Sequence, residues 1–371
     1  MPTSLLVATR KGLFTYDCRD GAPALVDDAF IGEPVTIAFH DPRDATTYAG
    51  LSLGHFGCKL HRRATGGTWE EVAAPAYPPK PDDAPVVRDP MRGEEVPWKI
   101  QQIWAIAPDH AQPGALWCGT IPGGLFHSAD RGDTWQLNMP LWMMPERAKW
   151  GGGGYDWPGI HSVVTHPSHP DRVMVAVSTG GAWRSDDRGQ TWRVSSHGMR
   201  AEYMPPGQEF DPIAQDAHLM AACDANPEVL WVQHHNGIFK SVDGGASWTE
   251  VTTAKPSAFG FAVAVHPRNP DVAWFAPAVK DERRVPVEGR VVVSRTRDGG
   301  ASFDVCSEGL PQQHAYHLIY RHGLVASAGD DRPRLAMGST TGSLWTSEDE
   351  GERWTRVSAD LPPIYALTWV D

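Results

Sequence analysis

Short runs of apolar residues recur along the whole chain and are separated by glycine, proline, aspartate and serine. Val35–Phe39, Leu116–Gly119 and Val173–Val177 are typical of these runs. They are too short for ordinary helices, and they are rich in residues that suit the pleated surface of a sheet. None is long and apolar enough to cross a membrane as a helix. The pattern predicts many short strands joined by turns.

One pattern of eight residues returns between these strands: Ser or Thr, then Asp, Gly, Thr or Ser, and an aromatic residue at fixed spacing. Copies lie at 128–135, 185–192, 241–248, 296–303 and 347–354, the last with Arg353 in place of the Thr, and a worn copy lies at 62–69 with Ala64 in place of the Asp. Short polar side chains bond nearby backbone N–H groups, and Gly accepts a positive φ. The pattern predicts a turn between the third and fourth strands of a repeated unit. Its carboxylates are predicted to be structural: Asp130, Asp187, Asp243, Asp298 and Asp349.

The remaining strands complete a four-stranded unit. Six units are expected, at about 33–72, 98–138, 158–196, 215–251, 258–307 and 313–357. The chain ends supply a seventh, from a first strand at 362–370 and further strands at 4–8, 13–16 and 24–30. The sequence thus predicts an all-β, seven-bladed β-propeller of four-stranded antiparallel blades, as a single domain over 1–371. Sharing one blade between the N- and C-terminal strands closes the ring and leaves no open sheet edge.

The composition of the chain limits the classes of binding partner that we expect. The net charge is −12 and no basic block stands out, so a nucleic acid is not expected. The five cysteines are scattered, odd in number and without a Cys-x-x-Cys pair, which favours reduced thiols in a cytoplasmic protein. Residues 1–16 lack the features of a secretory signal. We expect a small-molecule substrate as the partner, and neither a membrane nor a nucleic acid.

The repeated pattern resembles the Asp-box, or bacterial neuraminidase, repeat of sialidases, xyloglucanases, sortilin-type receptors and a photosystem II assembly propeller. Further segments are similar to an intracellular Asp-box group often labelled glycosyl hydrolase: 9–14, 119–122, 233–237, 259–261 and 338–342. The resemblance implies the propeller fold, whereas these families differ in chemistry. The Phe-Arg-Ile-Pro motif of sialidases is absent and Arg10 stands in a different context, so no sialidase residue is carried over.

Long segments are predicted at one end of the blades, opposite the repeated turns: 73–98, 138–159, 197–216 and 280–290. Long loops on a rigid scaffold are typical of binding and catalytic sites. His161, His218 and His317 are expected near the start of first strands at this end, and His234 in a second-to-third-strand turn. Imidazoles gathered from separate blades suit one divalent metal ion, which would activate water. The alternative is a polar lining in which these histidines bond backbone or water.

Other residues at this end are candidates for chemistry or binding. His161, His218, His317, Glu209 and Asp216 are candidate catalytic residues. Candidates for substrate binding are Arg10, Lys11, Gln102, Trp157, Tyr203 and Arg283. The glycine run 151–154 is a candidate hinge. His40, His166 and His266 are expected to be structural, because each occupies the same place at the end of a first strand.

Three functions remain open on the sequence. The first is a hydrolase or lyase of a small polar or acidic substrate, with or without a metal. The second is a sialidase-like glycoside hydrolase that uses paired carboxylates. The third is a binding or assembly propeller without catalysis.

Overall fold

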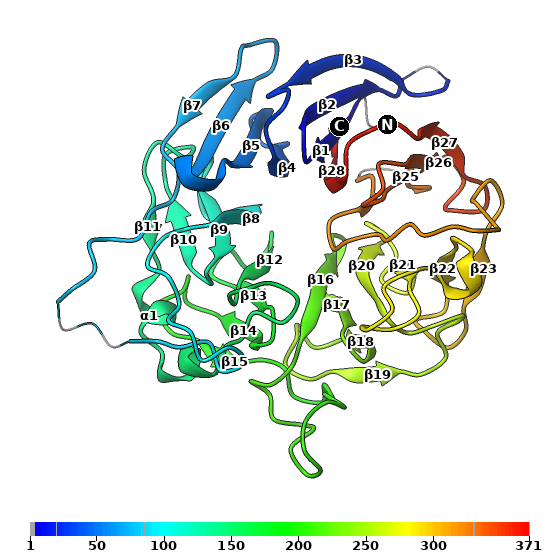
Figure 1. The fold of residues 1–371 in the computed structure, drawn as a ribbon. Coiled ribbons are helices and arrows are strands. Elements are labelled where there is room, and N and C mark those ends of the chain that lie inside the picture. Colours follow the sequence, from blue (N-terminus) through cyan, green and yellow to red (C-terminus); the bar gives the residue numbers. More distant parts are fainter. Residues whose placement is uncertain (1–3, 20, 83, 85, 329–330, 371) are drawn as a thin grey trace. The chain divides into compact units, whose positions relative to one another are not determined.

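The computed structural model describes residues 4–19, 21–82, 84, 86–328 and 331–370. Within these residues the strands form seven four-stranded antiparallel sheets (Figure 1). Contacts divide the chain into two compact units. The first comprises Met1–His40 and His218–Asp371, and the second comprises Asp41–Ala217.

The second unit begins at Asp41, the last residue of β4 (Val35–Asp41), whose sheet has the order β4-β5-β6-β7. Its strands are β5 (Thr46–Ser52), β6 (Cys58–Ala64), β7 (Glu70–Val72), β8 (Gln102–Pro108), β9 (Leu116–Ile121), β10 (Leu125–Ser128), β11 (Gln136–Leu137), β12 (Ile160–Thr165), β13 (Val173–Val177), β14 (Gly181–Ser185) and β15 (Arg193–Val194). The short helices of this unit lie between strands: η1 (Gly54–Phe56), α1 (Met139–Trp142) and η2 (Pro145–Lys149).

The first unit holds the sheet shared by the two chain ends and three complete meanders. Its strands are β1 (Ser4–Thr9), β2 (Gly12–Asp17), β3 (Ala24–Ala29), β16 (Ala217–Cys223), β17 (Asn226–His234), β18 (Gly237–Ser241), β19 (Thr249–Val251), β20 (Gly260–Val265), β21 (Ala273–Pro277), β22 (Val293–Thr296), β23 (Asp304–Cys306), β24 (Leu324–Ala326), β25 (Leu335–Gly338), β26 (Leu344–Ser347), β27 (Thr355–Ser358) and β28 (Ile364–Val370). One short helix, η3 (Val287–Gly289), precedes β22.

The predicted fold class is confirmed: the chain is an all-β, seven-bladed β-propeller with four-stranded antiparallel blades. The terminal blade has the order β28-β1-β2-β3, and β28 pairs with β1 from Ser4↔Val370 to Thr9↔Ile364. Strands β28 and β1 accordingly lie side by side in Figure 1. None of the helices that the structure describes has the length and apolar character needed to span a membrane.

One predicted strand start is wrong. The sixth unit was expected from residue 313, with His317 near the start of its first strand, but β24 begins at Leu324. Ala315, Leu318 and Ile319 are buried all the same, as part of an irregular segment. Their apolar character therefore reflects burial of a loop and not a strand, which the spacing of apolar residues does not distinguish.

The repeated turns have the bonding that their sequence predicts. In the copy at 241–248, Asp243 Oδ1 accepts hydrogen bonds from Ser241 Oγ (2.8 Å) and from the backbone N–H of Ser247 (2.9 Å). Asp243 Oδ2 accepts from the Ser247 hydroxyl at 2.6 Å. The Gly245 N–H donates to Ser241 Oγ at 2.9 Å, and Gly245 has a φ of 80°. The carboxylate is therefore saturated within its own turn.

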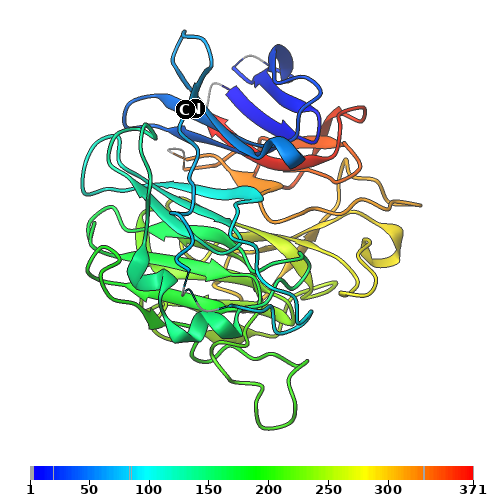
Figure 2. The ribbon, with the colours of Figure 1, turned by 60° about the vertical axis from the view of Figure 1, so that its left-hand side comes forward.

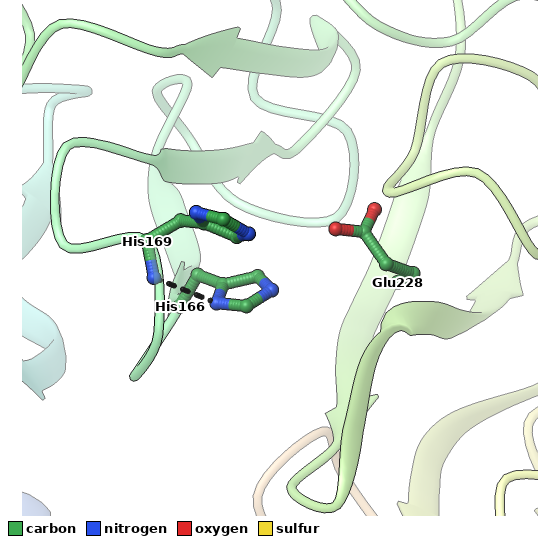
Figure 3. A group of neighbouring side chains, drawn as sticks. All are labelled: His166, His169 and Glu228. Atoms are coloured by element: carbon green, nitrogen blue, oxygen red, sulfur yellow. Dashed lines mark hydrogen bonds between the residues drawn. The ribbon is translucent and has the colours of Figure 1, made fainter.

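Two of the three repeated histidines hold their own turns. His166 Nδ1, just after β12, accepts from the backbone N–H groups of Ser168 (3.2 Å) and His169 (3.1 Å). His266 Nδ1, just after β20, accepts from the backbone N–H groups of Arg268 (3.0 Å) and Asn269 (3.2 Å) in the same way. Figure 3 shows the His166 and His169 rings side by side, and their centroids are 4.6 Å apart; it also draws Glu228 of β17. These contacts support the structural role expected for His166 and His266.

Candidate functional site

The long segments of the second unit lead into first strands. Residues 73–101 precede β8, 138–159 precede β12, and 195–216 precede β16. We call the end of a sheet where its first strand starts the first-strand end, and the end that carries the repeated turn the turn end. Figures 1 and 2 both show the green segment after β15 extending away from the strands. The loop-rich end predicted from the sequence is thus the first-strand end.

A buried carboxylate ties two of these segments together. Asp89, which is 1% exposed, accepts from the backbone N–H groups of Met91 and Arg92 through Oδ1, each at 2.9 Å. Its Oδ2 accepts from the Gly152 N–H at 3.0 Å. Asp89 therefore holds segment 73–101 against segment 138–159, which is a structural role.

The glycine run is anchored where it begins. The Gly151 N–H donates to Thr179 O at 2.8 Å, and the Gly152 N–H bonds to Asp89. A Cβ on Gly152 would lie 2.1 Å from Tyr155 O, so only glycine fits there. Gly151 and Gly152 are buried, and only the following two glycines are exposed. The hinge expected over 151–154 is therefore fixed at its first half.

Asp216 is the central candidate in this unit. Asp216 is 6% exposed and lies directly before β16. A Cβ placed on Gly153 would lie 3.4 Å from Asp216 Oδ2 and 2.8 Å from Thr179 Oγ1, so these three residues are neighbours. We call Asp216, Thr179, Gly153 and Tyr203 the Asp216 cluster.

Tyr203 completes this cluster through its hydroxyl group. The hydroxyl donates to Ala214 O at 2.5 Å, while 44% of the residue stays exposed. Burial of the hydroxyl raises the pKa of Tyr203 far above its usual range, and the negative charge of Asp216 raises it further. The phenol therefore stays protonated beside the carboxyl, and its ring offers an exposed apolar face.

An aromatic wall adjoins the same loop. Trp104 of β8 packs edge-on against Tyr155, with ring centroids 4.5 Å apart, and against His161 of β12 at 5.3 Å. Trp104 is 3% exposed and His161 is fully buried. His161 Nδ1 lies 2.8 Å from Ser162 Oγ. Because loop 151–159 carries both Gly153 and Tyr155, it links this wall to the Asp216 cluster.

Asp216 differs from the other buried acids of the described residues, which are Asp41, Asp89 and Asp109. Asp41 pairs with Arg43 at 2.6 Å, and Asp109 pairs with His127 at 2.8 Å and Arg188 at 2.7 Å. Asp89 holds backbone N–H groups, as described above. Asp216 alone among these four adjoins a half-exposed aromatic ring at a first-strand end.

The first unit has a different first-strand end, built around Phe261 of β20. His218 of β16 stacks on the Phe261 ring, with centroids 4.4 Å apart and planes 13° apart. His218 Nδ1 lies 2.6 Å from Gly260 O, which makes Nδ1 the donor. His235 lies edge-on to His218 at 5.4 Å and to Phe259 at 5.8 Å. The prediction that His218 stands at the start of a first strand is confirmed.

Arginines surround the same ring. The guanidinium groups of Arg284 and Arg321 lie 5.3 Å and 5.5 Å from the Phe261 centroid. Arg284 pairs with Asp281, while Arg321 is 5% exposed. Burial raises the pKa of Tyr365, and the charge of Arg10 opposes that shift. This end of the first unit is therefore aromatic and cationic.

The remaining predicted histidines point to separate neighbours. His234 is fully buried, packs on Phe239 at 5.2 Å, and its Nδ1 accepts from the Asn236 N–H at 3.1 Å. His317 packs edge-on to Trp345 at 5.1 Å, and its Nδ1 lies 2.5 Å from Thr341 Oγ1. Burial lowers the pKa of His317. Within the first unit the structure brings His218 to His235 and gives His234 and His317 other partners, so a metal held by His161, His218, His234 and His317 stays a prediction.

The other predicted site residues lie at first-strand ends but differ in setting. Glu209 is half-buried, and its Oε2 accepts from the Gly207 N–H at 2.7 Å. Gln102, the first residue of β8, and Trp157 are half-buried. The exposed residues are Arg10, Lys11 and Arg283.

Sequence reasoning missed Trp104, Thr179 and Arg321. Trp104 stands in an apolar strand, where a core role is the ordinary interpretation. Thr179 and Arg321 lie in short turns whose neighbours in space come from distant segments. No motif marks these three positions, so their roles emerge only from the tertiary contacts.

No family model matches this chain. A xyloglucanase from Paenibacillus sp is 24% identical over 235 residues, which is 56% of this chain and 22% of that protein. A xyloglucanase from Hypocrea jecorina is 26% identical over 161 residues, which is 36% of this chain and 18% of that protein. The chain thus spans about a fifth of the length of these relatives.

Solved structures agree on the fold. An ancestral GH74 enzyme aligns with a TM-score of 0.57 and 13% identity, over 90% of this chain and 38% of its own. YCF48 from Cyanidioschyzon merolae aligns with a TM-score of 0.54 and 13% identity, over 89% of this chain and 87% of its own. At such identities the similarity establishes the propeller fold alone. In kind, the chain is similar to propellers of the glycoside hydrolase type.

Proposed function

We propose that this propeller is a carbohydrate-active hydrolase of the glycoside hydrolase type, with Asp216 as its proton-donating carboxyl group. The observation that carries the proposal is the buried carboxyl of Asp216 at a loop-rich first-strand end, beside the exposed ring of Tyr203. The sequence similarity to xyloglucanases favours a β-linked glucan as the substrate class.

Cleavage of a glycosidic bond needs a carboxylic acid that protonates the leaving oxygen and a second carboxylate that acts as base or nucleophile. We assign the first role to Asp216, because its carboxyl group is buried at the loop-rich end beside Tyr203. We assign the second role to Glu209, because it lies on the same segment as Asp216. Gln215 holds that segment folded, since its Nε2 donates to Glu209 O (3.0 Å) and Asp211 O (2.7 Å).

Aromatic side chains supply the surface on which a sugar ring can lie. Tyr203 is 44% exposed, and Tyr155 and Trp157 are half-buried on the loop that also carries Gly153. Aromatic rings bury the apolar faces of a ligand, and a phenol or indole keeps a polar edge for hydrogen bonding. Tyr155 packs edge-on against the buried ring of Trp104, which supports its position on this surface.

The test is an assay for hydrolysis of xyloglucan and β-linked gluco-oligosaccharides, measured by the release of reducing ends. We expect Asp216→Asn to lower kcat/KM by about 10²- to 10⁴-fold, the usual contribution of a general acid. Asp243→Asn is the matched control, because it makes the same change in a carboxylate saturated within a turn, and it should leave kcat/KM unchanged. Wild-type protein that neither hydrolyses nor binds any of these glucans would refute the proposal.

A divalent metal ion is a separate proposal with its own test. Elemental analysis of the purified protein, before and after a chelator, is compared with that of a His161→Ala/His218→Ala variant. Stoichiometric metal in the wild type that is lost in the variant would support metal-assisted hydrolysis. Equal metal content in both proteins would rule out these two histidines as ligands.

A further inference from the structure

An apolar groove of about 600 Å³ lies in the second unit, apart from the Asp216 cluster. Described residues of the segment before β8, from Pro78 to Pro81 and from Val86 to Arg88 together with Trp98, form one wall, and α1 with η2 forms the other. Its lining includes four prolines, Trp98, Trp142 and Met143. Apolar side chains at its edge are unusually exposed: Met143 by 62%, Val86 by 55% and Met139 by 44%.

Arg147 of η2 lines this groove and is only 8% exposed. Its guanidinium lies 3.4 Å from the centroid of the Trp142 ring, and Nη1 donates to Trp142 O at 2.7 Å. Its Nε has no hydrogen-bond partner among the residues that the structure describes. Burial lowers the pKa of Arg147 to about 10. A buried cation without a counter-ion lowers the stability of the fold. A negatively charged ligand group beside Arg147 would therefore be bound favourably.

The charged residues near Arg147 that the structure describes do not neutralise its guanidinium. Over the described part of the chain, no carboxylate forms an ion pair with Arg147. Glu95, on the neighbouring segment, pairs with Lys80 at 2.8 Å. Arg88 lines the groove as a second cation and donates to Gly93 O at 3.0 Å. The groove is therefore apolar along its walls and cationic at Arg147.

We propose that this groove binds a small organic acid with an apolar body, whose carboxylate pairs with Arg147. The apolar body lies along the prolines, Trp98 and Met143, and it covers side chains that are now exposed to water. The volume falls within the range of small-molecule sites, and a guanidinium binds a carboxylate through two parallel hydrogen bonds. This site is independent of the hydrolase proposed above, because it shares no residue with the Asp216 cluster.

The test uses pairs of ligands that differ in charge alone. Decanoate is compared with 1-decanol, and 4-phenylbutyrate with 4-phenylbutanol, by isothermal titration calorimetry. We expect each acid to bind about tenfold tighter than its alcohol, since a hydrogen bond to a charged group contributes roughly that factor. Equal affinity of acid and alcohol, or no binding of either acid, would overturn the proposal.

Two variants separate the two parts of the site. Arg147→Met should weaken acid binding about tenfold and leave alcohol binding within about twofold, because it removes the charge and keeps the apolar volume. Arg19→Met, an exposed arginine of the first unit, is the matched control and should change neither. Unchanged acid binding by Arg147→Met would reject Arg147 as the partner.

Met143→Glu keeps the test decisive if Arg147→Met fails to fold. Met143 is 62% exposed, so this change should be tolerated by the fold. It places a negative charge on the apolar wall, and we expect it to abolish binding of acid and alcohol alike. Acid binding that survives Met143→Glu would place the ligand outside this groove.

Discussion

Charged side chains have different surroundings at the turn end and at the first-strand end of the blades. At the turn end, Asp243 receives three hydrogen bonds from residues within four positions of it. At the first-strand end, Asp216 is buried beside Tyr203, and Arg321 is buried beside Phe261, 60 positions away in the chain. A carboxylate saturated by its own turn has little capacity left for a ligand. The contrast indicates that local bonding builds the scaffold and long-range burial builds the sites.

After Asp216→Asn, the largest effect is expected from a glycine beside Asp216. Gly153→Ala places a Cβ 2.8 Å from Thr179 Oγ1 and 3.4 Å from Asp216 Oδ2, at a φ of +60°. We expect it to lower kcat/KM at least about tenfold, because small displacements of a reacting group are costly. Gly93→Ala carries the same backbone strain (φ +71°) with nothing within 4 Å, and should cost about 1 kcal/mol of stability without loss of kcat/KM. Equal activity losses in both would remove the link to Asp216.

A turn carboxylate should show the reverse behaviour. Asp243→Ala removes three hydrogen bonds within the turn at 241–248. We expect it to lower the free energy of unfolding by about 1–2 kcal/mol and to leave glucan hydrolysis unchanged. Urea unfolding and the hydrolysis assay, run on one preparation, provide the measurement. Lost activity in a fully folded Asp243→Ala protein would break the division between the two ends.

The unpaired cation of the groove makes a smaller prediction. Arg147→Met replaces a buried charge by an apolar side chain of similar length, so stability should stay equal or rise by up to about 1 kcal/mol. Thermal unfolding measures this change. Saturating decanoate should raise the melting temperature of the wild type and not that of the variant. A marked loss of stability in Arg147→Met would show that its bond to Trp142 O and its contact with the ring outweigh the burial of charge.

The smallest effect concerns pH. A hydrogen bond from the Ser302 hydroxyl lowers the pKa of Asp298 from 3.8 to about 2. A carboxylate whose folded-state pKa is depressed stabilises the fold above its unfolded pKa, and loses that contribution as pH falls through the folded value. The difference in melting temperature between wild type and Asp298→Asn should therefore shrink between about pH 4 and pH 2. A difference that stays constant to pH 2 would contradict the turn bonding.

The blades were predictable because their signals are local. The repeated turns at 128–135 and 241–248, and the apolar runs beside them, fix the third and fourth strands through bonds within a few residues. The terminal blade followed from counting strands, and β28 pairs with β1 as expected. The start of β24 was missed because Leu318 and Ile319 are buried without sheet pairing.

The candidate site was predictable only in part. Asp216, Tyr203 and His161 were named from their place before or within first strands, and the structure buries Asp216 and His161 there. The structure places His234 against Phe239 and His317 against Trp345, and the metal site of four histidines stays a prediction. The direction of a side chain depends on which distant residue it meets, and strand spacing leaves that open.

The sequence by itself determined the repeat, the blade count and the end of each blade that carries long loops, because all three depend on contacts between near neighbours in the chain. Only the tertiary structure decided that Asp89 is a tie between loops, that Asp216 adjoins Tyr203, and that Arg147 is buried without a carboxylate partner among the described residues. Burial and charge pairing depend on segments far apart in sequence, and a carboxylate or guanidinium carries no local mark of the partner that it will meet.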